Sequence, residues 1–232
     1  MSSSPHTSVT LRGVGRDYAG GVTALRAVDL DISPGELVAI VGPSGSGKTT
    51  MLNVMGTLDR PSRGRVVIDG FDVAELADRE LSALRAQRIG FVFQHFHLAP
   101  GVSVLDNVAD GVLYAGVRLR ERRERAEAAL RLVGLGHRLT HHPHALSGGE
   151  KQRTAIARAV VGEPALLLAD EPTGALDSRS GEGVMRLLLE LNKIGTTIVV
   201  ITHEQVVASH LPRRVSLLDG RIVDDRTAVG RR

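Results

Sequence analysis

The chain has 232 residues, 42% of them hydrophobic, which is enough to bury a sizeable core in one or two domains. It contains no cysteine, so disulfides, thiolate metal sites and thiol catalysis are excluded. The net charge is only +3, and with 3% aromatic residues and no Trp the composition argues against a module that binds nucleic acid by base stacking.

No segment has the character of a secretion signal or a membrane span. The amino-terminal stretch MSSSPHTS is polar and lacks the apolar centre of a signal peptide. Apolar runs such as 165–169 are far shorter than the ~18 residues that a spanning helix needs. We therefore expect a cytoplasmic chain that depends on another protein for any membrane span.

The first part of the chain reads mostly as strands and turns. The alternation over 8–18 and 24–32 predicts an antiparallel pair of strands. An apolar strand at 36–42 then enters a glycine-rich loop, from which a helix leaves over 48–58. Further strands are predicted at 65–70 and 88–94.

Helical patterns replace strands in the middle of the chain, with helices predicted at 103–116 and 120–135. Apolar side chains in the second recur at helical spacing: Ala126, Ala129, Leu130 and Val133. We therefore expect a helical subdomain over roughly 96–160, inserted into an α/β core. Arg and Glu alternate over 118–125, which indicates a solvated helix face or, alternatively, a nucleic-acid-binding stripe.

Strands and helices alternate again in the last part. The stretch 165–170 is apolar on both faces, as a central parallel strand requires. A helix at 180–193, a strand at 196–202 and a closing strand pair at 214–225 follow. The helix carries one apolar stripe, formed by Val184, Leu187, Leu188 and Leu191. Strands alternating with helices around a glycine loop predict an α/β fold with a doubly wound core.

The glycine loop GPSGSGKT satisfies the pattern G-x-x-x-x-G-K-[ST] between a predicted strand and helix, the context that identifies a phosphate-binding P-loop. Its glycines let backbone N–H groups approach phosphates, Lys48 supplies a cation for the β- and γ-phosphates, and Thr49 supplies a hydroxyl for Mg²⁺. The alternative is a chance glycine loop. The predicted ATP ligands here are Gly42, Pro43, Ser44, Gly45, Ser46, Gly47, Lys48, Thr49 and Thr50.

A P-loop needs an acidic residue at a neighbouring strand end to hold Mg²⁺. Asp170 ends the strand 165–170, and Glu171 follows it, placed to orient an attacking water as general base. The alternative, that both carboxylates cap the next helix, is opposed by Pro172.

Two further strands end in polar side chains. Gln94 can contact Mg²⁺ and the attacking water, and His203 can hydrogen-bond the γ-phosphate. Taken alone, each residue is more readily interpreted as a structural polar residue. Together with the P-loop and the acidic pair they predict catalytic roles for Glu171, His203 and Gln94, and metal ligands at Thr49, Gln94 and Asp170.

The stretch LSGGEKQR has the character of a second phosphate-binding helix start. Its Ser147 lies 99 positions after Lys48. One bound nucleotide does not require two phosphate-binding helix starts on the same chain.

The motifs GPSGSGKT, FVFQ, LSGGEKQR, LLLADEP, GALD and ITHE, in this order, resemble the ATP-binding subunits of ABC transporters from about Val9 to Asp225. The resemblance implies a single ABC-type ATP-binding domain over 1–232: a P-loop NTPase core of mixed, mainly parallel sheet, with an antiparallel β subdomain and an inserted helical subdomain. It also implies a homodimer that holds two ATP molecules between the P-loop of one chain and the LSGG segment of the other.

By this resemblance Ser147, Gly148, Gly149 and Glu150 contact the partner's ATP, Tyr18 stacks on adenine, and Asp177 lies in a loop that crosses to the partner's site. Tyr18 is also readable as a simple strand-end tyrosine. Two residues depart from the family pattern: Glu150 stands where many members carry Gln, and Gly174 where Ser is frequent. A carboxylate in the first turn suits the helix dipole, whereas Gly174 loosens the inference for its loop.

The resemblance is greatest to subunits that serve macrolide-export and lipoprotein-releasing permeases. It implies a partner with an FtsX/MacB-like domain in the membrane, docked on His95–Leu105, and a chain that lies peripherally on the inner face of the cell membrane. No nucleic-acid partner is expected. Five histidines cluster in two places without a carboxylate at ligand spacing, so a metal site is not expected there: His95, His97, His141, His142 and His144.

Three other functions are alternatives for a chain with a P-loop. A DNA-repair or ribosome-associated ATPase of the same superfamily would carry long coiled coils or two cassettes, and a P-loop kinase would lack LSGG. The third, an ATPase of a cell-division or signalling complex that regulates a membrane partner without transporting a substrate, stays open on sequence alone.

Overall fold

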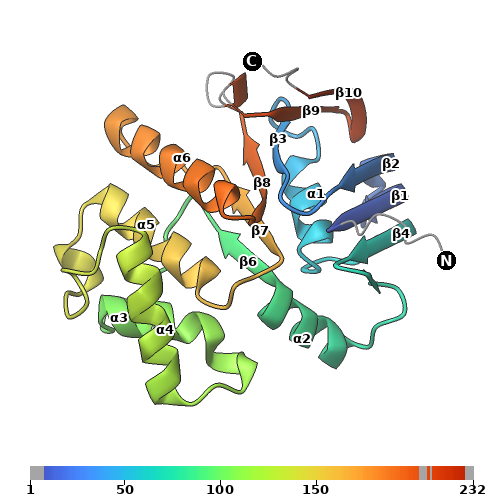
Figure 1. Cartoon of the computed structure of the whole chain (residues 1–232). Coiled ribbons are helices and arrows are strands. Elements are labelled where there is room, and N and C mark those ends of the chain that lie inside the picture. Colours follow the sequence, from blue (N-terminus) through green and yellow to red (C-terminus); the bar gives the residue numbers. More distant parts are fainter. Residues whose placement is uncertain (1–7, 204–207, 210, 228–232) are drawn as a thin grey trace.

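A computed structural model describes residues 8–203, 208–209 and 211–227, and these form a four-stranded and a six-stranded sheet with helices around them (Figure 1). The ends of the predicted domain, 1–7 and 228–232, and Glu204 of the ITHE motif lie outside the described residues. In chain order the elements are β1 (Val9–Tyr18), β2 (Val22–Ile32), β3 (Leu37–Val41), α1 (Lys48–Met55), β4 (Arg63–Ile68), β5 (Phe71–Asp72), α2 (Asp78–Arg88), β6 (Ile89–Val92), α3 (Val104–Ala109), η1 (Asp110–Ala115), α4 (Leu119–Leu132), η2 (Pro143–Ala145), α5 (Gly148–Val160), β7 (Leu166–Asp170), α6 (Ser178–Lys193), β8 (Thr197–Thr202), β9 (Arg213–Leu218) and β10 (Arg221–Thr227).

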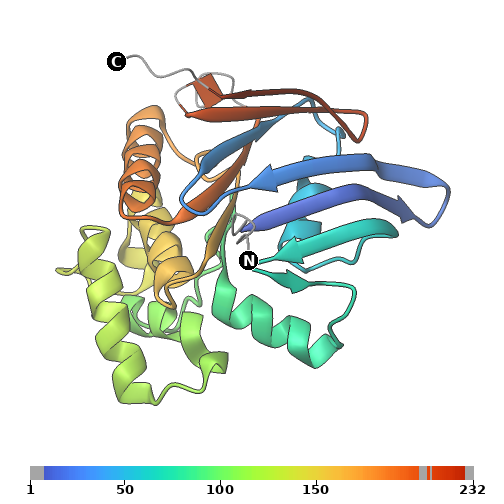
Figure 2. The ribbon, with the colours of Figure 1, turned by 45° about the vertical axis from the view of Figure 1, so that its right-hand side comes forward.

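The six-stranded sheet has the order β10-β9-β3-β8-β7-β6. Its strands run parallel from β9 to β6, and β10 pairs antiparallel with β9 at one edge. The other sheet, β2-β1-β4-β5, is antiparallel throughout and lies across α1 from the first (Figure 2). The predicted mixed, mainly parallel sheet with an antiparallel β subdomain is therefore confirmed.

Both faces of the six-stranded sheet are covered, and β3 shows why its sequence is apolar throughout. Leu37, Ala39 and Val41 belong to the core between the sheet and helices α3–α6, whereas Val38 and Ile40 belong to the core shared with α1 and the antiparallel sheet. Because successive side chains of a strand point to opposite faces, a strand between two cores carries no polar position.

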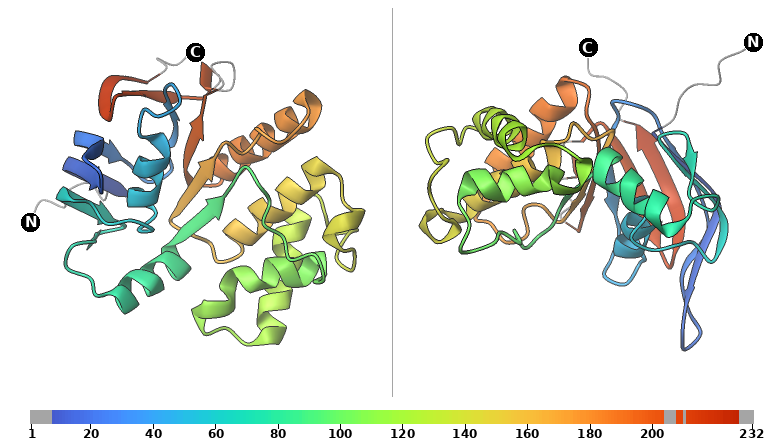
Figure 3. Two further views of the ribbon diagram at one scale, coloured as in Figure 1. Left: turned by 180° about the vertical axis from the view of Figure 1, so that it is seen from behind. Right: turned by 90° about the horizontal axis from the view of Figure 1, so that it is seen from below.

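Helices form one lobe beside the sheets, with no strand described between Val104 and Val160 (Figure 3). The apolar stripes of α4 and α6 are buried as predicted. The predicted helix 103–116 is divided into α3 and the 3₁₀ helix η1, and within η1 Val112 has a non-helical backbone. No helix among the described residues is long and apolar enough to cross a membrane.

Two elements besides the three-residue 3₁₀ helix η2 were not predicted. The first is α2, which carries Asp78 and Glu80 in its first turn and buries only Leu81 and Leu84. The second is β5, which is only two residues long. An apolar stripe this sparse gives a weak periodic signal, and a two-residue strand gives none.

Candidate nucleotide-binding site

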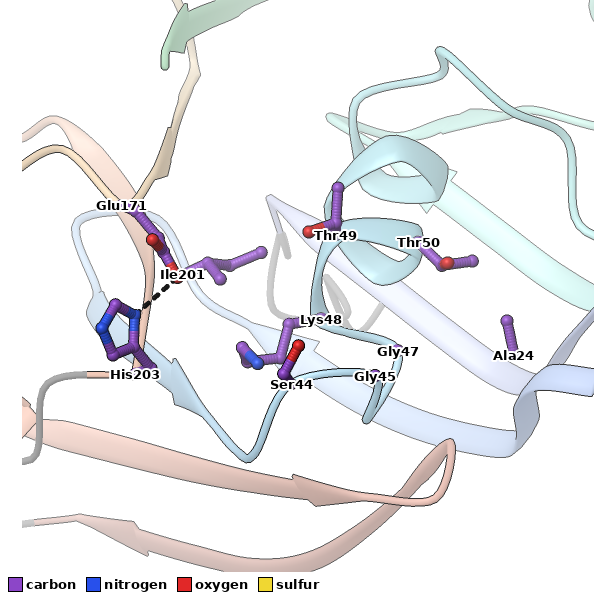
Figure 4. A pocket seen from close by; sticks show the side chains of 10 residues that line it. All are labelled: Ala24, Ser44, Gly45, Gly47, Lys48, Thr49, Thr50, Glu171, Ile201 and His203. Carbon is purple, nitrogen blue, oxygen red and sulfur yellow. Dashed lines mark hydrogen bonds and ion pairs between the residues drawn. The ribbon is translucent and has the colours of Figure 1, made fainter. Parts of the chain in front are cut away.

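A pocket of about 490 Å³ opens where the carboxyl ends of β3, β7 and β8 meet the glycine loop (Figure 4). In open α/β sheets this edge is where ligands bind. The predicted residues that line it are Ser44, Gly45, Gly47, Lys48, Thr49, Thr50, Glu171 and His203. Sequence reasoning missed Ala24 and Ile201, which line it too but are small or apolar strand residues without a chemical signal.

The glycine loop adopts a backbone that only glycine supports easily. Gly45 and Gly47 have φ values of +78° and +101°, and a Cβ on Gly47 would lie 2.4 Å from the carbonyl oxygen of Ala24. Since Gly47 is the N-cap of α1 and provides no side-chain cap, the first N–H groups of α1 have no intrahelical or side-chain acceptor among the described residues. Such a helix start attracts an anion, which fits a phosphate group.

Lys48 points its ammonium into this loop. Its Nζ donates to the carbonyl oxygens of Gly42 and Pro43 at 2.9 and 2.8 Å, and the residue is only 8% exposed. Gly42 and Pro43 therefore hold the cation and do not line the pocket. Ser46 lies beneath the loop, and its buried Oγ has no hydrogen-bond partner in the described structure.

Glu171 and His203 lie next to one another on one side of the pocket (Figure 4). The Nδ1 of His203 lies 2.7 Å from Oε1 of Glu171. Glu171 has a φ of +45°, which is uncommon for a residue with a side chain, and its N–H donates to the carbonyl of Ile201 at 2.9 Å. The strained turn after β7 thus presents the carboxylate toward the pocket, a form of strain that is frequent at functional sites.

Asp170 lies at the end of β7, behind the pocket lining. Burial, followed by the charge of Glu171, raises the pKa of the Asp170 carboxyl, and the Lys48 ammonium opposes this shift. A bound divalent cation would favour the charged carboxylate. The donor set of Asp170 and the Thr49 hydroxyl consists of hard oxygen atoms, which suits Mg²⁺.

Gln94 lies two residues beyond the end of β6, not within the strand as predicted, and it does not line the pocket. It lies against the segment after Glu171, because a Cβ on Gly174 would be 2.9 Å from the Gln94 amide nitrogen. The departure at Gly174 therefore leaves room for the Gln94 side chain.

Tyr18 ends β1 outside the pocket lining. It pairs with Val22, two residues before Ala24, which does line the pocket. Its hydroxyl donates to Asp59 at 2.8 Å, and the Arg16 guanidinium lies 4.5 Å from the ring centroid. One ring face is thus occupied, and stacking on adenine stays a prediction for the other.

The second predicted phosphate grip is exposed and does not contribute to the pocket. Ser147 caps α5: its Oγ accepts from the Glu150 N–H at 3.3 Å, and Glu150 accepts from the Ser147 N–H at 2.9 Å. The Ser147 N–H, followed by the Ser147 hydroxyl and the ion pair with Arg138, lowers the pKa of the Glu150 carboxyl. Glu150 therefore orders the helix start that presents Ser147 and Gly148 at the surface.

Asp177 is likewise a helix cap, at the start of α6. Its side chain accepts from the Ser180 N–H at 2.9 Å and from the Ser180 hydroxyl at 2.8 Å, and the first of these bonds lowers its pKa. The residue is away from the pocket, so a role at a partner's site stays a prediction.

Comparison with known proteins agrees with this geometry. The sequence profile of the family described as ABC transporter matches residues 25–174. The chain is 50% identical to the uncharacterized ABC transporter ATP-binding protein YknY of Bacillus subtilis, covering 93% of this chain and 95% of that protein. It is also 50% identical to a macrolide export ATP-binding/permease protein MacB of Paracoccus denitrificans over 94% of this chain, but it spans only 33% of that protein's length.

A solved structure of the ATP-binding cassette MJ0796, dimeric, in a post-hydrolysis state and bound to ADP and Pi, superposes with a TM-score of 0.86. It is 43% identical and covers 96% of this chain and 99% of its own. A second similar structure, cbiO1 of Clostridium perfringens, is 31% identical with a TM-score of 0.87 over 96% of this chain and 89% of its own. A P-loop at the sheet edge, a separate LSGG helix start and these matches place the chain in the ABC transporter family, as an ATP-binding cassette.

Proposed function

We propose that this cassette hydrolyses ATP as a homodimer and drives a conformational change in a separate membrane permease. The observation that carries the proposal is the separation of its two phosphate-binding features. The uncapped N-terminus of α1 opens into the pocket, whereas Ser147 and Gly148 at the start of α5 are exposed and lie outside the pocket. A second copy of the chain is the simplest source of a phosphate for that exposed helix start.

Residues in the pocket and beside it have distinct roles in this proposal. Lys48 and the N–H groups of α1 bind and orient the phosphates, while Thr49, Asp170 and Gln94 would hold Mg²⁺, which neutralises phosphate charge when bound. Glu171 accepts a proton from the attacking water as general base, and His203, 2.7 Å from it, orients that carboxylate.

The dimeric form of the solved relative supports the two-chain arrangement. In it, Ser147 and Gly148 would complete the partner's site with a hydroxyl, N–H groups and the positive end of a helix dipole. Loss of the γ-phosphate would remove what the two chains share, so that hydrolysis separates them. Separation of the two chains after hydrolysis would then move the permease subunits bound to them.

Cross-linking tests the two-chain arrangement, and the lack of native cysteine makes it direct. One protein carries Ser44→Cys and another Ser147→Cys, both with Glu171→Gln so that the ATP-bound dimer persists. A disulfide requires Cα atoms within about 7 Å. We expect a covalent dimer on mild oxidation that requires ATP and Mg²⁺, and that is lost when Lys48→Ala is added to the Ser44→Cys chain.

A single chain with both cysteines serves as the internal control. It should link between molecules and not within one. If it forms only an internal disulfide, LSGG serves its own nucleotide, and the homodimer mechanism is wrong.

A membrane partner is supported by the macrolide-export relatives, whose names place an ATP-binding part and a permease in one protein. The predicted docking stretch begins at His95. Its backbone is held by Arg158 of α5, which donates to the carbonyls of Phe96 and His97 at 2.9 and 2.7 Å. Beside it lies a hollow of about 220 Å³ lined by Phe91, Phe93 and Arg158 among others. A helix of the permease at this place would set the chain on the inner face of the membrane.

Changing Phe96 to Asp should abolish co-purification with the permease while the isolated chain keeps its ATPase rate within about twofold. Phe96 is partly exposed, so a charge there opposes an apolar contact more than the fold. The matched control is Phe71→Asp, on β5 of the antiparallel sheet and 45% exposed, which should still co-purify. Unfolding of the Phe96→Asp chain would show that Phe96 is core. Identifying the captured permease also separates transport from the cell-division or signalling alternative.

A further inference from the structure

One side chain of α5, that of Gln152, contacts both of the loops that carry predicted catalytic residues. It is 0% exposed, and its Nε2 donates to the carbonyl oxygens of Pro172 at 2.7 Å and Phe93 at 3.2 Å. Phe93 immediately precedes Gln94, and Pro172 immediately follows Glu171. One amide group therefore joins the backbones beside two predicted catalytic residues.

The chemistry of the contact requires an amide. Both acceptors are carbonyl oxygens, and an NH₂ group has two hydrogens to offer them. Its own carbonyl oxygen, Oε1, is buried without a hydrogen-bond partner in the described structure. A buried unpaired acceptor is unfavourable. We therefore infer that the hydrogen bonds donated by Nε2, and not Oε1, determine the position of the side chain.

The same helix begins at the exposed LSGG segment. Ser147 caps α5, and Gln152 lies five residues later, in the second turn of that helix. Because an α-helix moves as a rigid rod over one or two turns, a shift of its start moves Gln152 with it. Arg158, two turns further on, holds the carbonyls of Phe96 and His97, so the helix contacts the Gln94 loop twice.

We propose that Gln152 is a positioning residue that transmits engagement of the LSGG segment, by an ATP held on the second copy, to Gln94 and Glu171 of its own chain. The inference rests on the proposed homodimer. Through this tie, the contact that one chain makes with its partner's nucleotide sets the catalytic loops for its own.

The variant Gln152→Met keeps the length and volume of the side chain but removes both donors. Thr154→Val is the matched control: Thr154 lies on the same helix, is also 0% exposed, and donates only to the carbonyl of Glu150 within that helix. Gln152→Met loses two buried hydrogen bonds and Thr154→Val loses one, so a purely structural role predicts lower stability for both and the same kcat per folded molecule. Gln152→Leu, which also lacks donors and is smaller, replaces the Met variant if that chain fails to fold.

We expect kcat of Gln152→Met to fall about 10²-fold, the scale of a 1 Å misplacement of catalytic groups, with the Kd for ATP within about threefold. Thr154→Val should keep kcat within about threefold. Amide hydrogen exchange, measured with Glu171→Gln added to each variant, then tests whether ATP binding at the LSGG segment orders the two catalytic loops. Addition of ATP should protect 147–150 in both variants, but protection of 93–96 and 171–174 should be smaller in Gln152→Met than in Thr154→Val.

Equal kcat for the two variants per folded molecule, or equal protection of the loops, overturns the inference. If instead the chain with Gln152 intact neither hydrolyses ATP nor dimerises with it, the proposed function itself fails. The two failures are therefore distinct.

Discussion

Glu171→Gln should lower ATP turnover by about 10²–10⁴-fold, the contribution that general-base catalysis makes, while ATP still binds. The carboxylate is held by a strained turn at φ +45° and by His203 at 2.7 Å, and the amide keeps its shape but cannot accept the proton. The ATP-bound dimer should accumulate, which size-exclusion chromatography with and without ATP would show.

The control for this substitution is Glu75→Gln, an exposed carboxylate on the loop after β5 that has no place in the pocket. It should turn over ATP at the rate of the unchanged chain. Near-normal turnover in Glu171→Gln would remove Glu171 from the role of general base and leave His203 as the remaining candidate in the pocket.

Lys48→Ala should abolish tight ATP binding, with loss of turnover as a consequence. The Nζ is the cation fixed inside the P-loop by the carbonyls of Gly42 and Pro43. Removing one member of a buried charge pair costs about 2–5 kcal/mol, which corresponds to roughly 30-fold to 4,000-fold in Kd. Titration with a fluorescent ATP analogue would measure this.

Lys193→Ala provides the matched control, because Lys193 is an exposed lysine in the last turn of α6. Its Kd should equal that of the unchanged chain. An unchanged Kd in Lys48→Ala would contradict the assignment of the glycine loop as the phosphate site.

The sequence by itself determined the fold class and the nucleotide loop. Strand β3 is apolar at every position, and β7 at every position before Asp170, because both lie between two cores. The helices α4 and α6 show one apolar stripe because they bury one face. The P-loop pattern is equally local, since a strand, a glycine turn and a helix start make the anion site from contiguous residues. The sequence did not predict α2 or β5, because α2 has a weak apolar periodicity and the two-residue β5 forms only by pairing with a neighbouring strand.

Only the tertiary structure decided how distant segments meet. It brought Glu171 and His203 within 2.7 Å of one another, although 32 positions separate them. It placed Ala24 at the pocket edge, which no chemical signal marks. Such contacts depend on the strand order of the sheet, and a sequence pattern does not encode which strand ends become neighbours.

The same reason explains the LSGG segment and Gln152. The sequence marks a helix start with Ser and Gly, but the exposure of Ser147 outside the pocket follows from the placement of α5 in the helical lobe. Gln152 reads in sequence as one polar residue of an amphipathic helix. Its burial and its bonds to Phe93 and Pro172 exist only because α5 packs against the ends of β6 and β7, where two loops leave carbonyl oxygens that need a donor.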